Sequence, residues 1–219
     1  MPVALPSHGP ARILLTVGLV LGLAACGSDE AAPDLTVPDA PEGCPDNRWP
    51  PCPEGEDLRA RGNWVGSVLP SLVGVDQFGD DVDLLQFRGA TAVLSFGATW
   101  CAPCRSDAAN YEATRDYVAG DAAGPVWMIE FLDDARDVER GLHADWAEAY
   151  GIDEPVLGGP AMSSAAFAMG ISGFPTKVVV DYDGRIVGRL SGSGQWDVIR
   201  TWVLEAERRR LDAENADAS

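Results

Sequence analysis

The residues of this 219-residue chain best suited to chemistry are two cysteines with two residues between them, Cys101 and Cys104. They follow an apolar, partly β-branched segment, Thr91–Phe96, which predicts a buried strand, and Pro103 suits the first turn of a helix because its missing N–H is not needed there. A cysteine at a helix start faces unpaired backbone N–H groups, which favour the thiolate over the thiol. The pattern therefore predicts a redox pair in which Cys101 attacks a disulfide and Cys104 resolves the mixed disulfide.

A cysteine pair of this spacing can also be half of a zinc site, which needs four ligands. Beyond residues 1–25 the only histidine is His143, and Cys44 and Cys52 are too far apart for a zinc knuckle. We therefore expect no metal and no organic cofactor, and a copper relay is a weaker alternative. His143 falls within a predicted helix and is interpreted as a packing or surface residue.

Residues 1–25 have the pattern of a secretion signal. An apolar run, Ile13–Ala25, is too short to remain as a membrane-spanning helix, and it ends in Leu23-Ala24-Ala25-Cys26, which resembles the bacterial lipobox. We expect cleavage before Cys26 and a lipid on its sulfur; an ordinary signal peptide that leaves Cys26 as a free thiol is the alternative. The chain is then expected in the cell envelope, anchored to a membrane by the lipid and facing the periplasm or the exterior.

Residues 26–60 predict a flexible tether, since Pro, Asp, Glu, Gly and Ala dominate them and few large apolar residues are present. Within it, Cys44 and Cys52 are expected to form a structural disulfide rather than a second catalytic pair, because neither is at a predicted helix start. With Cys26 assigned to lipid, all five cysteines have a role.

The formal net charge of −18 argues against binding to nucleic acid, which needs clustered Lys and Arg, and against adhesion to anionic lipid by charge alone. A preference for basic partners is one interpretation. The simpler one is a solvated acidic surface that keeps a secreted protein soluble.

The remaining sequence predicts one α/β domain at residues 61–211 and a disordered tail at 212–219. Strand, helix and strand in succession predict a parallel strand pair, and Asp183-Gly184 predicts a tight hairpin, so the sheet is expected to be mixed. The predicted elements are a hairpin over Leu72–Val82, a helical turn at Leu84–Phe87, strands at Thr91–Phe96, Val126–Leu132, Pro155–Leu157, Thr176–Asp181 and Arg185–Leu190, and helices from Cys101 to Val118 and at Arg136–Tyr150, Ser163–Met169 and Gln195–Arg210.

Two motifs occur in order: ATWCAPCR at residues 98–105 and GISGFPT at residues 170–176. Together they resemble the thioredoxin superfamily, and within it the membrane-anchored TlpA and ResA type, over roughly Val65–Glu207. The resemblance implies a thioredoxin-like fold, with a central mixed β-sheet flanked by helices on both faces. It also implies that Trp100 and Pro103 support the cysteines, that Pro175 is a cis-proline beside them, and that the backbone of Phe174 pairs with an extended substrate segment.

The chain departs from that family pattern in its polar residues. Asp107 stands where these relatives usually carry a glutamate that tunes the thiols, although it is equally a favourable acid in the first turns of a helix. Ser95 replaces the buried aspartate of thioredoxin. Glu130, on the neighbouring predicted strand, is a candidate for the missing carboxylate near Cys104, or else it faces solvent at an edge.

Two apolar positions differ as well. Phe174 precedes the proline where smaller or β-branched residues are common, and it is expected to narrow the substrate groove. Ala109 replaces a proline that often kinks the active-site helix, so a straighter helix is expected.

These observations predict a monomeric enzyme that exchanges thiols and disulfides with proteins of the cell envelope. The sequence does not give the redox direction, and cytochrome c maturation is one function known for such relatives. The alternatives are a binding lipoprotein whose cysteine pair stays oxidised and, from another enzyme class, a thiol peroxidase, which generally needs a lone reactive cysteine.

Overall fold

The computed structural model describes residues 47–50, 62–133, 141–159 and 161–218. Cys26, Cys44 and Cys52 lie outside these residues, as do the predicted signal peptide and the first residues of the helix predicted from Arg136. Within the described part of the chain, no helix is both long enough and apolar enough to cross a membrane.

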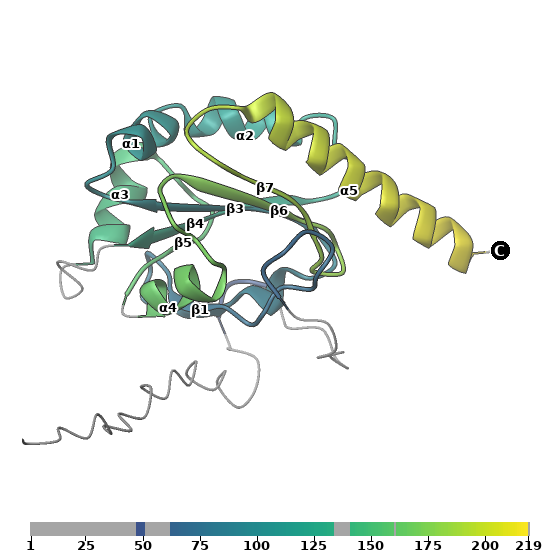
Figure 1. Ribbon diagram of the computed structural model, residues 1–219, viewed down its shortest axis with the longest axis horizontal. Coiled ribbons are helices and arrows are strands. Elements are labelled where there is room, and N and C mark those ends of the chain that lie inside the picture. The colour runs from purple at the N-terminus through teal and green to yellow at the C-terminus, as the bar shows by residue number, and fades with distance from the viewer. Residues whose placement is uncertain (1–46, 51–61, 134–140, 160, 219) are drawn as a thin grey trace, which may run out of the picture. The chain divides into compact units, whose positions relative to one another are not determined.

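The centre of the domain is a five-stranded mixed sheet in the order β5-β4-β3-β6-β7 (Figure 1). The middle strand β3 pairs in parallel with β4, as predicted, and antiparallel with β6, a pairing that the sequence did not indicate. Strand β3 is buried along almost its whole length, which explains why its sequence is mostly apolar and does not alternate between apolar and polar residues. The strands are β3 (Thr91–Ala98), β4 (Val126–Asp133), β5 (Val156–Leu157), β6 (Thr176–Val180) and β7 (Ile186–Ser191).

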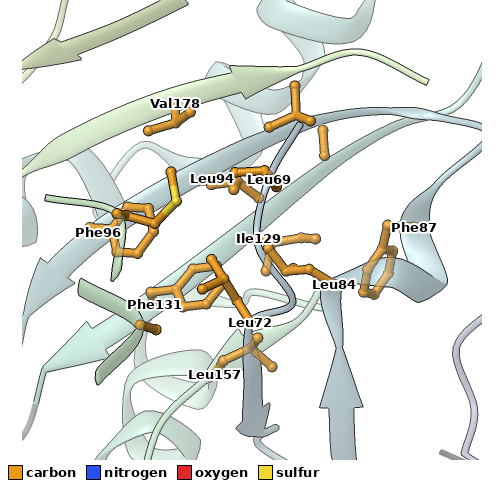
Figure 2. Close-up of a cluster of buried hydrophobic side chains, with 14 of the residues drawn as sticks. Leu69, Leu72, Leu84, Phe87, Leu94, Phe96, Ile129, Phe131, Leu157 and Val178 are labelled. Carbon is orange, nitrogen blue, oxygen red and sulfur yellow. The ribbon is translucent and has the colours of Figure 1, made fainter. Parts of the chain in front are cut away.

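Elements cover both faces of this sheet (Figure 1). One face packs against α1 (Ala102–Ala108), α2 (Tyr111–Ala119), α3 (Leu142–Tyr150) and α5 (Trp196–Asp217). The other packs against α4 (Ala161–Ala168), the hairpin of β1 (Val73–Val75) and β2 (Asp81–Asp83), and the short 3-10 helix η1 (Leu84–Phe87). Figure 2 shows the apolar core on this second face, where Phe96 and Phe131 stack with ring centroids 4.7 Å apart.

The helix predicted to run from Cys101 to Val118 is instead two helices, so the expectation of a straighter helix at Ala109 is wrong. The break lies at Asn110, whose backbone is not helical (φ −120°, ψ 26°). Its side-chain amide donates to the carbonyl of Ser106 at 3.3 Å. Asparagine competes for helix backbone groups in this way, so it can interrupt a helix without a proline.

The C-terminal helix is longer than predicted. Helix α5 continues to Asp217, whereas we expected it to end near Arg210 and residues 212–219 to be disordered. Its last turns are linked by ion pairs one helical turn apart, Arg208 with Asp212 at 2.6 Å and Arg210 with Glu214 at 2.5 Å. A pair at this spacing stabilises a helix by about 0.3 kcal/mol, and the amino-acid composition of the segment does not show the spacing.

Part of the predicted tether is not a tether, because residues 47–50 lie against the domain. The indole N–H of Trp49 donates to Asp76 at 2.8 Å, and Arg48 forms an ion pair with Asp80 at 3.1 Å. The Trp49 ring lies 6.0 to 6.4 Å from three other rings, those of Trp127, Phe87 and Phe78. We call residues 47–50 the N-terminal strap.

Replacing Trp49 by alanine is expected to lower the free energy of unfolding by about 2 kcal/mol, less than the ~3–5 kcal/mol of a fully buried aromatic residue because Trp49 is half-buried. Urea unfolding of the purified chain would measure it. The matched control is Trp64→Ala, since Trp64 is 60% exposed and should cost no more than about 0.5 kcal/mol. Equal losses in the two variants would show that the strap adds nothing to stability.

Candidate active site

Cys101 and Cys104 form a disulfide where β3 leads into α1, with their Cα atoms 5.2 Å apart. Cys101 is the N-cap residue of α1, and its Sγ accepts a hydrogen bond from the backbone N–H of Cys104 at 3.2 Å. A side-chain carbon added at Gly97 would lie 3.4 Å from Cys104 Sγ, so Cys104 rests directly on the backbone of β3. The predicted strand-to-helix placement of the pair is what the structure shows.

Aromatic side chains border the disulfide. Trp100 is 56% exposed, and its ring lies edge-on to that of Phe174 with centroids 6.0 Å apart. Phe174 also packs against the buried cluster that contains both cysteines. The peptide bond between Phe174 and Pro175 is cis, as the resemblance implied. Pro103 occupies the first turn of α1.

Asp107 lies one turn after Cys104 and is held by two hydrogen bonds. Its carboxylate accepts from the ammonium group of Lys177 at 2.7 Å and from the backbone N–H of Gly194 at 2.9 Å. Lys177 is completely buried, donates also to the carbonyl of Gly192 at 2.9 Å, and lies 4.4 Å from the centroid of the Trp196 ring. Asp107 therefore joins α1 to β6 and to the segment between β7 and α5.

Sequence reasoning missed Lys177. The available signal was a lone charged residue in β6, followed by three valines and two residues after Pro175. A charged residue in a strand buried on both faces needs a partner inside the protein, which could have pointed to Asp107.

Glu130 does not face solvent at a sheet edge; it lies on β4 beside Ser95 of β3, which in turn pairs with Lys177 of β6. Its carboxylate accepts a hydrogen bond from the indole N–H of Trp146 at 2.6 Å. Glu130, Ser95 and Asp107 all line one narrow cavity. Leu132, two residues further along β4 and on the same face, pairs with Gly97, on which Cys104 rests.

Burial raises the pKa of Glu130 to about 7, and the negative charge of Asp107 adds to this shift. The hydrogen bond from Trp146 and the positive charge of Lys177 oppose it. At neutral pH Glu130 is thus close to half-protonated, whereas an exposed glutamate would be fully ionised. It is suited to gain or lose a proton beneath the active-site helix.

The described residues contain no group of three or more His, Cys, Asp or Glu side chains that could hold a metal ion. His143 is buried on α3, and its Nε2 lies 3.0 Å from the carbonyl oxygen of Asp76. Its ring packs against Gly158, where an added side-chain carbon would overlap it. His143 is thus a packing residue, one of the two interpretations that the sequence left open.

The raised pKa of Glu130 predicts that the free energy of unfolding falls as the pH rises. The folded state holds this proton more tightly than the unfolded state, whose value is near 4.5, so the stabilising effect of protonation is present below pH 4.5 and disappears as the pH rises through about 7. Glu130→Gln keeps an oxygen to accept from Trp146 but cannot ionise. Relative to Glu130→Gln, the wild-type chain should lose about 2 kcal/mol of stability between pH 5 and pH 8.

Urea unfolding at the two pH values measures this loss, with Glu148→Gln as the control because Glu148 is exposed on α3. A wild-type to Glu130→Gln difference that stays the same at pH 5 and pH 8 would refute the assignment.

Comparison with known proteins agrees with this geometry. The chain is 25% identical over 131 residues to the thiol-disulfide oxidoreductase ResA of Bacillus thuringiensis subsp. konkukian, covering 58% of this chain and 70% of that protein. It is 30% identical over 119 residues to the thiol:disulfide interchange protein HelX of Rhodobacter capsulatus, covering 54% and 61%.

Among solved structures, the thioredoxin domain of a thiol-disulfide oxidoreductase from Bacteroides vulgatus matches with a TM-score of 0.54 at 22% identity, covering 64% of this chain and 98% of that one. The fold is therefore thioredoxin-like, as expected. The model of the AhpC/TSA family matches residues 65–189, which include β3, the cysteine pair and Pro175. The chain belongs to the AhpC/TSA family.

Proposed function

We propose that this chain is a thiol-disulfide oxidoreductase that acts on protein thiols or disulfides of the cell envelope through Cys101 and Cys104. The observation that carries the proposal is the disulfide at the start of α1, with the backbone N–H of Cys104 aimed at Cys101 Sγ. The names of the ResA and HelX relatives support the same reaction.

In the reducing direction, the thiolate of Cys101 attacks one sulfur of a partner disulfide. The partner S–S bond breaks, a mixed disulfide forms, and the departing partner sulfur takes up a proton. The thiolate of Cys104 then attacks Cys101 Sγ, which releases the second partner thiol and closes the Cys101–Cys104 disulfide. Two electrons pass from the chain to its partner, and the reverse sequence oxidises a partner dithiol.

Cys101 is suited to be the attacking residue because its sulfur caps α1. The N–H that donates to it in the disulfide is also available to a thiolate, and charge-assisted hydrogen bonds are stronger than neutral ones. Cys104 is suited to be the resolving residue because it rests on Gly97 and its sulfur, unlike that of Cys101, does not cap α1. Phe174 and Trp100 form an aromatic border against which the partner segment would lie.

The location belongs to the same proposal and is supported by the sequence of the N-terminal segment. Residues 1–25 serve as a signal peptide, and a lipid on Cys26 anchors the chain to a membrane. A disulfide between Cys44 and Cys52 fits an oxidising compartment outside the cytoplasm.

The Cys104→Ala variant should trap the partner. Without the resolving sulfur, the mixed disulfide on Cys101 cannot be released, so the reduced full-length variant should form covalent adducts with envelope proteins that disappear on reduction. Non-reducing electrophoresis followed by mass spectrometry of the adducts measures this. The control is Cys101→Ala, which lacks the attacking sulfur and should form few or no adducts.

The same preparations separate this proposal from its alternatives. The wild-type chain should equilibrate with glutathione buffers, and both single-cysteine variants should lose the reduction of insulin disulfides. A pair that cannot be reduced in such buffers would indicate a binding protein. Rapid consumption of hydrogen peroxide by the reduced chain, without insulin reduction, would indicate a peroxidase.

A further inference from the structure

The most unusual side chain near the cysteines is the buried lysine. The side chain of Lys177 has no exposed surface, while that of its partner Asp107 is 12% exposed. A buried cation is costly unless it is paired and hydrogen-bonded, and Lys177 meets this requirement through Asp107, the carbonyl of Gly192 and the face of Trp196. The cost of burying these two charges beside the candidate site indicates that the ion pair has a function there.

The register of the sheet places Lys177 close to the disulfide. Lys177 pairs with Ser95, and two residues further along β3 is Gly97, on which Cys104 rests. Side chains two residues apart on a strand lie on the same face and about 6.6 Å apart. Lys177 is therefore one row of the sheet before the row on which Cys104 rests, and its ammonium group holds Asp107, one helical turn after Cys104.

Two acidic side chains lie near Lys177. Asp107 comes from α1 and Glu130 from β4, and both line the same cavity, which at about 10 Å³ holds one water molecule at most. Tyr111 of α2 also borders the cavity but donates its hydroxyl to Glu154 at 2.7 Å. The charges of Asp107 and Lys177 already act on Glu130 in opposite directions, so the three groups are within electrostatic reach of one another.

We propose that Lys177 is a positioning residue for thiol chemistry at Cys101 and Cys104. It ties α1 to the strand that follows Pro175, and its charge offsets the two acids below the disulfide when a thiolate forms above them. This inference rests on the proposed function. It gives the Lys177–Asp107 ion pair, which no sequence motif indicates, a role in how readily the cysteine thiols ionise.

The charges give predictions of opposite sign. Removing the cation in Lys177→Met leaves Asp107 and Glu130 beneath the new thiolate, so the thiolate is disfavoured. Removing the anion in Asp107→Asn leaves Lys177 without its opposing charge, so the thiolate is favoured. If the Lys177–Asp107 pair served packing alone, both substitutions would disturb α1. The equilibrium between thiol and thiolate at Cys101 would then shift in the same direction in both variants.

The experiment is the rate of iodoacetamide alkylation of Cys101 against pH, in the reduced full-length chain. The midpoint of this profile should rise by about one pH unit in Lys177→Met, a tenfold change in the thiol equilibrium, and should fall in Asp107→Asn. The equilibrium with glutathione should shift toward the intramolecular disulfide in Lys177→Met and away from it in Asp107→Asn. Lys177→Arg, which keeps the charge, should lie closer to wild type than Lys177→Met.

Arg210→Met is the matched control, because Arg210 also forms a largely buried ion pair, with Glu207 at 3.1 Å. Glu207 accepts from Thr91 at the first residue of β3, whereas the cysteines follow the last. This variant should have the wild-type alkylation profile.

Several outcomes would overturn the inference: an unchanged midpoint in Lys177→Met, shifts of the same sign in Lys177→Met and Asp107→Asn, or an equal shift in Arg210→Met. If Lys177→Met does not fold, as judged by circular dichroism, Asp107→Asn decides alone, and an unlowered midpoint overturns the inference. A wild-type Cys101 that reacts no faster than a free thiol at neutral pH would instead refute the proposed function.

Discussion

The geometry of the candidate site depends on one constraint, the direct passage of a buried strand into a helix. Strand β3 is fixed between β4 and β6 by backbone hydrogen bonds, and α1 starts four residues after β3 ends, at Ala102. This fixes Cys101 at the helix start, where its sulfur accepts a hydrogen bond from the backbone N–H of Cys104. If α1 followed a flexible loop instead of a buried strand, the disulfide would lack this fixed N–H donor. The donor stays in place only while the helix is formed and held in position.

The strands and the cysteine pair could be predicted from sequence because their signals are local. Mostly apolar segments predicted β3, β4 and β6, and the Asp183-Gly184 turn predicted the hairpin between β6 and β7, where Gly184 has a φ of +78°. The cis bond before Pro175 was predicted only through the family resemblance. Nothing in the residues themselves requires that isomer.

The features that sequence reasoning missed depend on contacts between distant segments. Lys177 and Asp107 are 70 positions apart, and Trp49 bonds Asp76 across 27. The composition around Trp49 is that of a tether, and only the aromatic pocket formed by other segments makes this short stretch part of the domain. The break at Asn110 was overlooked for another reason, since asparagine ends a helix less reliably than proline and its effect depends on what the neighbouring backbone can bond.

The strap also bears on how the site would be presented. Trp49 packs against Trp127, near the start of β4, whereas Cys101 follows the end of β3, which runs parallel to β4. The strap is thus attached toward the opposite end of the strands from the disulfide. If Cys26 carries the proposed lipid, the 21 peptide steps from there to Asn47 can span at most about 75 Å. Attachment through the strap, in place of a tether that reaches residue 60, would shorten that reach, and the cysteines would lie toward the end of the strands that is away from the strap.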